Sequence, residues 1–225
     1  MRRSLRVLVL LVVAVLGAGG LSSVRAQAPA GQMTLVFNIS IVPRWFDPAE
    51  SEGLVTPFIF YYAIHDALVK PMPGNPSAPC LAESWTASPD GLTYEFVLRR
   101  NVRFHNGEAV TADDVKFSFE RYRGASAKTL KDNVASVEIV DPLRVRFRLK
   151  RPWPDFMTFY ASPATGAAWI VPKKYVERVG DEGFKKAPIG VGPYKVVAFK
   201  PGVELTLEAH EQFWRKTPSV KTLLL

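Results

Sequence analysis

Residues 102–115 (VRFHNGEAVTADDV) bring a histidine and three carboxylates within ten positions of one another: His105, Glu108, Asp113 and Asp114. Imidazole and carboxylate side chains are common ligands of divalent metals and common partners in acid–base catalysis. Their spacing here matches neither a zinc-site nor a calcium-site pattern. A structural role for these residues is therefore favoured over a catalytic or metal-binding one.

The same residues have ordinary positions in a turn and at the start of a helix. Asn106-Gly107 is a strong signal for a hairpin turn, because both residues adopt positive φ at low cost. Thr111 is typical of a helix N-cap, and the carboxylates of Asp113 and Asp114 favour the positive end of a helix dipole. The sequence thus predicts a helix that follows Thr111, runs to about Tyr122 and has one apolar face.

No nucleotide-binding or hydrolase motif is complete in this chain. Gly190-Val191-Gly192 begins like a dinucleotide-binding loop, but Lys195 stands where the third glycine is required. There is no Gly-x-Ser-x-Gly and no His-Glu-x-x-His, and the three histidines (His65, His105 and His210) are far apart in sequence. The single Cys80 excludes an internal disulfide and indicates a buried small apolar residue. We therefore expect that the protein is not an enzyme and that it binds no metal ion and no cofactor.

A basic side chain occupies every second position of 144–150: Arg144, Arg146, Arg148 and Lys150. Such a row could bind phosphates, and the chain would then be an exported basic module for anionic surfaces. More often it is the solvated face of an antiparallel sheet, where it discourages edge pairing. The second interpretation is favoured because the alternation places no aromatic residue on the same face as the cations.

The N-terminus has the layout of a secretory signal peptide. A basic start is followed by an apolar run over 7–16 and by Val24-Arg25-Ala26, which suits cleavage after Ala26. The apolar run is shorter than the ~20 residues that span a bilayer, so a membrane anchor is the weaker alternative. We expect residues 1–26 to be removed and the protein to be periplasmic, without a lipid anchor, since no cysteine lies near the cut.

Without residues 1–26, the chain has 25 basic and 21 acidic residues and a net charge of +4. This is an ordinary value for a soluble surface and gives little support to nucleic-acid binding. An apolar content of 48% indicates a globular protein. Periodicity and turn residues predict strands over 34–41, 92–98, 134–140, 143–149, 194–199 and 203–208. They predict helices over 58–68 and 172–179, and a proline-rich connector over 69–79 that marks a subdomain boundary.

Three stretches together resemble one protein family. LAESWTASPDGLTYEFVLRRNVRFHNGEAVTADDVKFSFER (81–121) is similar to the family signature almost throughout, and PIGVGPYKVVAFKPG (188–202) is similar to a second block. HEQFWRKTPSV (210–220) resembles the segment that follows, with His210 and Phe213 as departures from the usual residues. The family is that of the peptide-type solute-binding proteins of ABC importers, solute-binding protein family 5, which includes dipeptide-, oligopeptide- and nickel-binding proteins.

The resemblance implies a mixed α/β (α+β) fold of the type II periplasmic-binding-protein class. Residues 31–75 and 165–225 would form an incomplete first ligand-binding lobe, and residues 76–164 would form an inserted α+β subdomain. Family members are much longer, so we expect the second lobe to be missing and solute capture to be weak. We also expect an unpaired sheet edge near the C-terminus, prone to aggregation.

The resemblance also implies a function. The protein would bind a small solute, with short peptides as the favoured class, and deliver it to an ABC permease in the inner membrane without any chemistry. The stretch after the first strand resembles a cleft wall, so Pro43, Arg44, Trp45 and Phe46 are the candidate solute contacts. An aromatic ring offers contact area, and an arginine pairs with a carboxylate. Alternatively, Trp45 and Phe46 only pack between subdomains.

Overall fold

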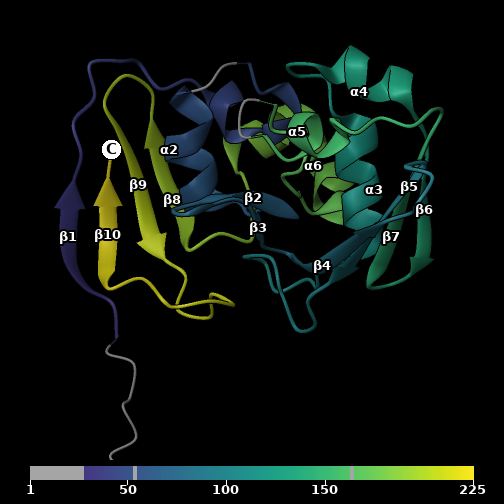
Figure 1. Ribbon diagram of the computed structural model, residues 1–225. Helices are drawn as coiled ribbons and strands as arrows, with labels where there is room; N and C mark the ends of the chain where they lie inside the picture. The colour runs from purple at the N-terminus through teal and green to yellow at the C-terminus, as the bar shows by residue number, and fades with distance from the viewer. Residues whose placement is uncertain (1–27, 53–54, 163–164) are drawn as a thin grey trace, which may run out of the picture.

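The computed structural model describes residues 28–225 apart from 53–54 and 163–164, so the expected signal peptide lies outside the described residues. In this part of the chain the strands form two four-stranded sheets and one two-stranded sheet, with helices packed against them (Figure 1). The fold is mixed α/β, as the sequence predicts. None of the described helices has the length and apolar character that a membrane crossing requires.

The first sheet joins the two ends of the described chain (Figure 1). Its strands, in spatial order, are β1 (Ala30–Thr34), β10 (Val220–Leu224), β9 (Glu204–Ala209) and β8 (Tyr194–Lys200). β1 pairs with β10 in parallel, whereas the other pairs are antiparallel. The hairpin of β8 and β9 confirms the strands predicted over 194–199 and 203–208.

The strand predicted over 34–41 is wrong in position, because β1 ends where that prediction begins. Its partner β10 ends at Leu224, and the last bond along the ladder runs from the amide of Leu35 to the carbonyl of Leu224 at 2.8 Å. The alternation of the later residues therefore finds no strand to pair with. The prediction of an unpaired sheet edge near the C-terminus is also wrong. The last strand, β10, lies inside the sheet between β1 and β9, and the edge strands of the sheet are β1 and β8.

Two short 3-10 turns, η1 (Pro43–Phe46) and η2 (Pro48–Glu50), lead into α2 (Val55–Ile64). The helix predicted over 58–68 is thus confirmed as far as Ile64. The connector predicted over 69–79 is instead a hairpin of β2 (Val69–Met72) and β3 (Asn75–Pro79). A two-stranded ribbon has two free edges, so its prolines remove few ladder hydrogen bonds.

The second sheet is a four-stranded antiparallel sheet at the other end of the molecule (Figure 1). Its spatial order is β4 (Ala82–Ala87), β5 (Thr93–Leu98), β7 (Arg144–Leu149) and β6 (Val134–Asp141). Burial alternates along β5 and β7, so that Phe96 and Phe147 face the core while the arginines of β7 face outward. The strands predicted over 92–98, 134–140 and 143–149 are confirmed.

The helices cover the inner face of this sheet and the space between the two sheets (Figure 1). They are α3 (Ala112–Arg121), α4 (Ala127–Asn133), α5 (Phe156–Tyr160) and α6 (Lys173–Lys186). α3 has the predicted N-cap and length. α6 is longer than the helix predicted over 172–179, because Gly180 turns the chain with φ of +70° and a second helical segment continues the first.

An aromatic core holds α3 and α5 against the second sheet. The ring of Phe147 lies 5.6 Å from that of Phe96, 5.2 Å from Phe119 and 4.9 Å from Tyr160, measured between centroids. Aromatic pairs at such distances contribute beyond the area that they bury. These ring contacts hold α3 and α5 in place on the second sheet.

Candidate functional site

The structure separates the polar residues of 102–115. The carboxylate of Asp114 accepts from the amide and the hydroxyl of Thr111 at 2.9 and 2.8 Å, which makes it part of a capping box. Asp113 pairs with Lys173 of α6 at 2.9 Å. His105 lies elsewhere and contacts Gly190 and Gly192. Within the described residues, no three His, Cys, Asp or Glu side chains gather as they would around a metal ion.

The three histidines, far apart in sequence, gather around Gly190–Gly192. His105 Nε2 donates to the carbonyl of Gly192 (3.0 Å), and its Nδ1 accepts from the amide of Gly190 (3.3 Å). The ring of His210 lies 5.1 Å from that of His105, and a Cβ on Gly190 would lie 2.7 Å from His65 Nδ1. The glycines of the incomplete dinucleotide motif therefore serve close packing against the backbone at the end of α2, beside the histidine cluster (His65, His105 and His210).

Burial controls the protonation of these histidines. It lowers the pKa of His65 to about 4 and that of His105 to about 3, and it also lowers the pKa of His210. His65 is fully buried and donates from Nε2 to the carbonyl of Phe46 (2.8 Å). The histidine cluster is thus uncharged at neutral pH and is tied directly to the candidate solute-binding segment.

The candidate segment is η1, and its four residues differ in exposure. Phe46 is fully buried, with its ring edge-on to Phe60 at 5.8 Å and to Phe199 at 5.0 Å. Trp45 is part-buried and stacks on Phe60 at 6.1 Å. Arg44 is exposed, and Pro43 is part-buried. Phe46 therefore anchors the segment, while Arg44 and one side of Trp45 remain accessible.

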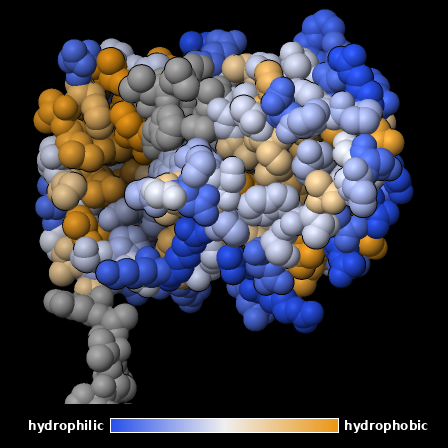
Figure 2. All heavy atoms as spheres, viewed as in Figure 1, coloured by the Kyte–Doolittle hydropathy of each residue, from blue (hydrophilic) through white to orange (hydrophobic). Residues whose placement is uncertain are grey.

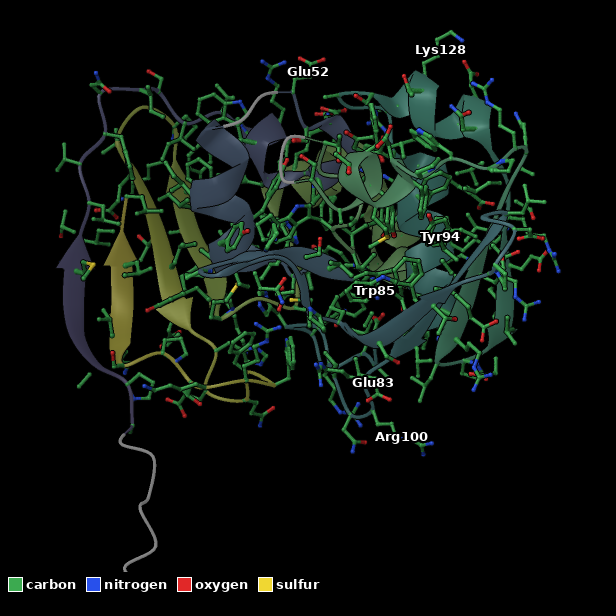
Figure 3. All side chains as sticks on the ribbon, viewed as in Figure 1. Glu52, Glu83, Trp85, Tyr94, Arg100 and Lys128 are labelled. Carbon is green, nitrogen blue, oxygen red and sulfur yellow. The ribbon has the colours of Figure 1, made fainter. Side chains whose placement is uncertain are left out.

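Arg44 pairs weakly with Glu52. Its Nη1 lies 3.4 Å from an oxygen of Glu52, and both side chains are more than half exposed. Figure 3 shows Glu52 on the upper edge of the molecule, on the opposite side from Arg100 and Glu83. Exposed pairs of this kind contribute about 0–1 kcal/mol, so an incoming carboxylate could replace Glu52 at little cost.

Asp47, directly after the candidate segment, was not anticipated from the sequence. Its side chain is fully buried and accepts from both terminal nitrogens of Arg121, at 2.7 and 2.5 Å. It also accepts from the amide of Ala49 (3.0 Å), and its carbonyl accepts from the hydroxyl of Tyr61 (3.1 Å). A Pro after an Asp signals a capped turn, but nothing in the local sequence points to a partner 74 positions away.

A pocket of about 220 Å³ opens beside this segment. It is lined by residues 34–37 and 39–41, by the tip of the β8–β9 hairpin and by Leu224 and Leu225. Phe199 forms part of its wall and also contacts Phe46, so the pocket and η1 share one aromatic support. Figure 2 shows apolar side chains gathered on this end of the molecule, above β1 and β10. A pocket that combines apolar side chains with a few polar groups is the usual form of a small-molecule site.

The cationic row of β7 is paired with acidic side chains. Arg146 Nη2 lies 2.7 Å from Glu95, and Arg148 Nε lies 2.5 Å from Glu138. Arg144 lies within 3.6 Å of both Glu95 and Asp141. The outer face of the second sheet is therefore a mixed-charge surface, which weakens the case for a basic interaction module.

With this geometry established, the known proteins that resemble the chain can be compared. The profile of the bacterial extracellular solute-binding proteins, family 5 (Middle), matches residues 77–225. The chain belongs to this family. Di/tripeptide-binding protein 2 of Pseudomonas aeruginosa is 31% identical over an alignment 227 positions long, which covers 89% of the chain and 42% of that relative. Glutathione-binding protein GsiB of Salmonella choleraesuis is 34% identical over 60% of the chain and 27% of the relative.

Solved structures of solute-binding proteins share the fold. MoaA of A. tumefaciens R10, in complex with mannopinic acid, superposes with a TM-score of 0.72 at 30% identity over 86% of the chain and 40% of its own. NikZ of Campylobacter jejuni, in complex with Ni(L-His), gives 0.70 at 29% identity over 87% of the chain and 38% of its own. The family 5 chain thus spans less than half the length of these relatives.

Proposed function

We propose that this family 5 chain contributes the solute-binding surface of an ABC importer, with short peptides as the solute class. The observation that carries the proposal is the likeness to a di/tripeptide-binding protein across 89% of the chain. The chain would act in the periplasm after loss of residues 1–26 and would deliver solute to a permease in the inner membrane. Residues 31–75 and 165–225 would belong to the ligand-binding lobe, and residues 76–164 to an insertion that supports it.

Solute contact is assigned to η1 and the adjoining pocket. Arg44 would pair with the terminal carboxylate of a peptide and displace Glu52, since that pair is long and exposed. Trp45, stacked on Phe60 from one side, would offer its other face to the peptide backbone or a side chain. Pro43 and Phe46 would set the position of these two residues, Phe46 from within the core.

The peptide class is tested by isothermal titration and thermal shift of the chain with di- and tripeptides and with glutathione, each at up to millimolar concentration. Binding of at least one peptide with a free carboxyl terminus is expected. The same peptide with an amidated C-terminus should bind roughly tenfold more weakly, the factor implied by losing one charge-assisted hydrogen bond. If no peptide changes the melting temperature or gives heat, the peptide assignment fails.

Variants locate the site. Arg44→Gln should remove the difference between the free and amidated peptides, and Trp45→Ala should weaken both by roughly tenfold. Arg100→Gln is the matched control, because it removes one exposed cation on the opposite edge of the molecule (Figure 3). Equal losses in Arg44→Gln and Arg100→Gln would indicate a general charge effect and would contradict the proposed site.

A further inference from the structure

We propose that Arg121 is a positioning residue for the candidate site: its salt bridge to Asp47 fixes the backbone of η1 and so the direction in which Arg44 and Trp45 point. The fixed backbone follows from the structure alone, whereas its effect on solute binding rests on the proposed function. Arg121 does not line the pocket, and its salt bridge to Asp47 is the contact through which it acts on η1.

The link between Arg121 and Asp47 is buried and bidentate. The side chain of Arg121 is 8% exposed and that of Asp47 is 0% exposed. Each terminal nitrogen of the guanidinium meets a different carboxylate oxygen, at 2.7 and 2.5 Å. Such a fork fixes the orientation of the carboxylate as well as its distance, and a lysine cannot reproduce it.

Asp47 carries this constraint into η1, because it follows Phe46 directly and its amide donates to the carbonyl of Arg44 (3.3 Å). The carbonyl of Phe46 is held by His65, and that of Asp47 by Tyr61. Phe46 is also packed between two rings. The backbone that follows Trp45 is thus held by hydrogen bonds at two successive residues, Phe46 and Asp47. The side chains of Arg44 and Trp45 themselves make few polar contacts.

A second carboxylate holds Arg121 from the other side. Asp181 accepts from Arg121 Nε and Nη2 at 3.0 and 2.8 Å, and the guanidinium lies 5.7 Å from the centre of the Phe184 ring. Asp181 also pairs with Arg123, which reaches Glu50 of η2. Two series of salt bridges therefore connect α6 to the turns that carry the candidate site. One runs from Asp181 through Arg121 to Asp47, and the other from Asp181 through Arg123 to Glu50.

The backbone claim is tested by hydrogen exchange of the solute-free chain, measured by mass spectrometry. Arg121→Lys keeps the charge but loses the fork, and it should increase exchange in peptides that cover 42–51 by roughly tenfold, the factor for one charge-assisted hydrogen bond. Peptides of the β6–β7 hairpin should be unchanged. Arg146→Lys is the matched control, because it removes a guanidinium whose Nε and Nη2 both donate to one oxygen of Glu95 on the outer sheet face, and it should leave 42–51 unchanged.

A purely structural role would give a different pattern. If Arg121→Lys lowered the melting temperature and raised exchange everywhere, or left 42–51 unaltered, the proposal would be overturned. Asp181→Asn distinguishes the contribution of Asp181 from that of Asp47. It weakens the contact of Arg121 to Asp181, which is 42% exposed, and leaves the buried contact to Asp47 in place. This variant should raise exchange in 42–51 by much less than Arg121→Lys does.

The solute claim is tested with the free-carboxylate peptide that wild type binds best. Arg121→Lys should weaken its affinity roughly tenfold at a temperature where the variant is fully folded, while Arg146→Lys should not. Unchanged affinity alongside increased exchange would show that the pose of η1 does not matter for binding, and would overturn this part. If wild type binds no peptide, the proposed function fails, and the exchange measurement still decides whether Arg121 fixes η1.

Discussion

Buried polar side chains define the surroundings of the candidate site at the scale of single residues. His65 reaches Phe46, Tyr61 and Arg121 reach Asp47, and each of these contacts joins residues that are distant in sequence. Burial of a polar group is costly unless it is paired. The segment from Phe46 to Asp47 is therefore the part of the turn that cannot move without breaking several paired groups at once.

The histidine cluster should make the protein lose stability in mild acid. A histidine whose folded pKa lies below its unfolded value of 6.5 costs no stability at higher pH, because neither state is protonated there. As pH falls from 6.5, only the unfolded state takes up the proton, so stability decreases until the folded pKa is reached. For His65, with a folded pKa of about 4, the loss is on the order of 3 kcal/mol.

This dependence is measured by urea unfolding between pH 7.5 and 4.5. The carboxylates with lowered pKa values, Glu50 and Asp181, begin to lose their contribution only when pH falls below their unfolded values of 4.5 and 3.8, so the histidine effect is separated from theirs. His105→Gln, which can keep a donor and an acceptor near Gly190, should flatten the profile. A wild-type profile that is flat down to pH 5 would show that the histidines are not buried as described.

At the scale of elements, the turn at Gly190 should tolerate no side chain. A Cβ there would lie 1.9 Å from the carbonyl oxygen of Ile64 at the end of α2, and backbone cannot yield as a side chain does. Gly190→Ala is expected to lower the free energy of unfolding by about 3 kcal/mol or more. Gly183→Ala is the control: its Cβ would meet the Val179 side chain at 2.9 Å rather than backbone, and alanine favours a helix by about 1 kcal/mol, which offsets part of that contact.

Chemical denaturation of the two variants decides the point. Equal midpoints for Gly190→Ala and wild type would mean that this turn and α2 are farther apart than the structure places them. The same measurement tests whether the turn at Gly190–Gly192 binds phosphate. We expect added ATP to leave the denaturation midpoints of wild type and Gly183→Ala unchanged, because the dinucleotide-binding motif is incomplete.

The outer face of the second sheet should bind anionic polymers weakly. Its arginines are paired with Glu95, Glu138 and Asp141, and salt at about 0.1 M screens exposed charges beyond about 10 Å. We expect release from heparin at low salt, and later elution for the double variant Glu95→Gln/Glu138→Gln. Retention of wild type at high salt would favour the basic-module alternative.

The sequence predicted the local elements well where their signals are local. Alternation along 92–98 and 143–149, and the N-cap at Thr111, each depend on neighbours within a few residues, and all three are confirmed. The strand over 34–41 failed because pairing depends on where β10 ends, almost 190 positions later. The Asp47–Arg121 pair could not be predicted either, because it joins residues 74 positions apart. Arg44 and Trp45 could be proposed because they lie in one short stretch that resembles a cleft wall of the family.

At the scale of the whole molecule, an apolar strip covers the end that carries β1. Met33, Leu35, Val36, Ile39 and Val203 are all at least 40% exposed, and Val36 reaches 91%. Figure 2 shows apolar residues concentrated at this end, whereas the opposite end is mainly polar. Contiguous apolar surface next to a sheet edge favours association.

We expect the chain to associate as its concentration rises, as measured by sedimentation velocity. Val36→Lys combined with Val203→Lys should shift the population toward monomer without changing the melting temperature. Ile139→Lys, a similar change at an exposed position on β6, should have no effect. A wild-type chain that stays monomeric at all concentrations would contradict the role of the apolar strip.

The parallel pairing of β1 with β10 determines when folding can finish. Every other pairing in the described sheets joins strands that are closer together along the chain, whereas Ala30 meets Val220. During synthesis from the N-terminus, the first strand therefore has no partner in this sheet until residues 220–224 have emerged. Closure of the first sheet is thus a late step of folding, because it joins segments that the ribosome releases far apart in time.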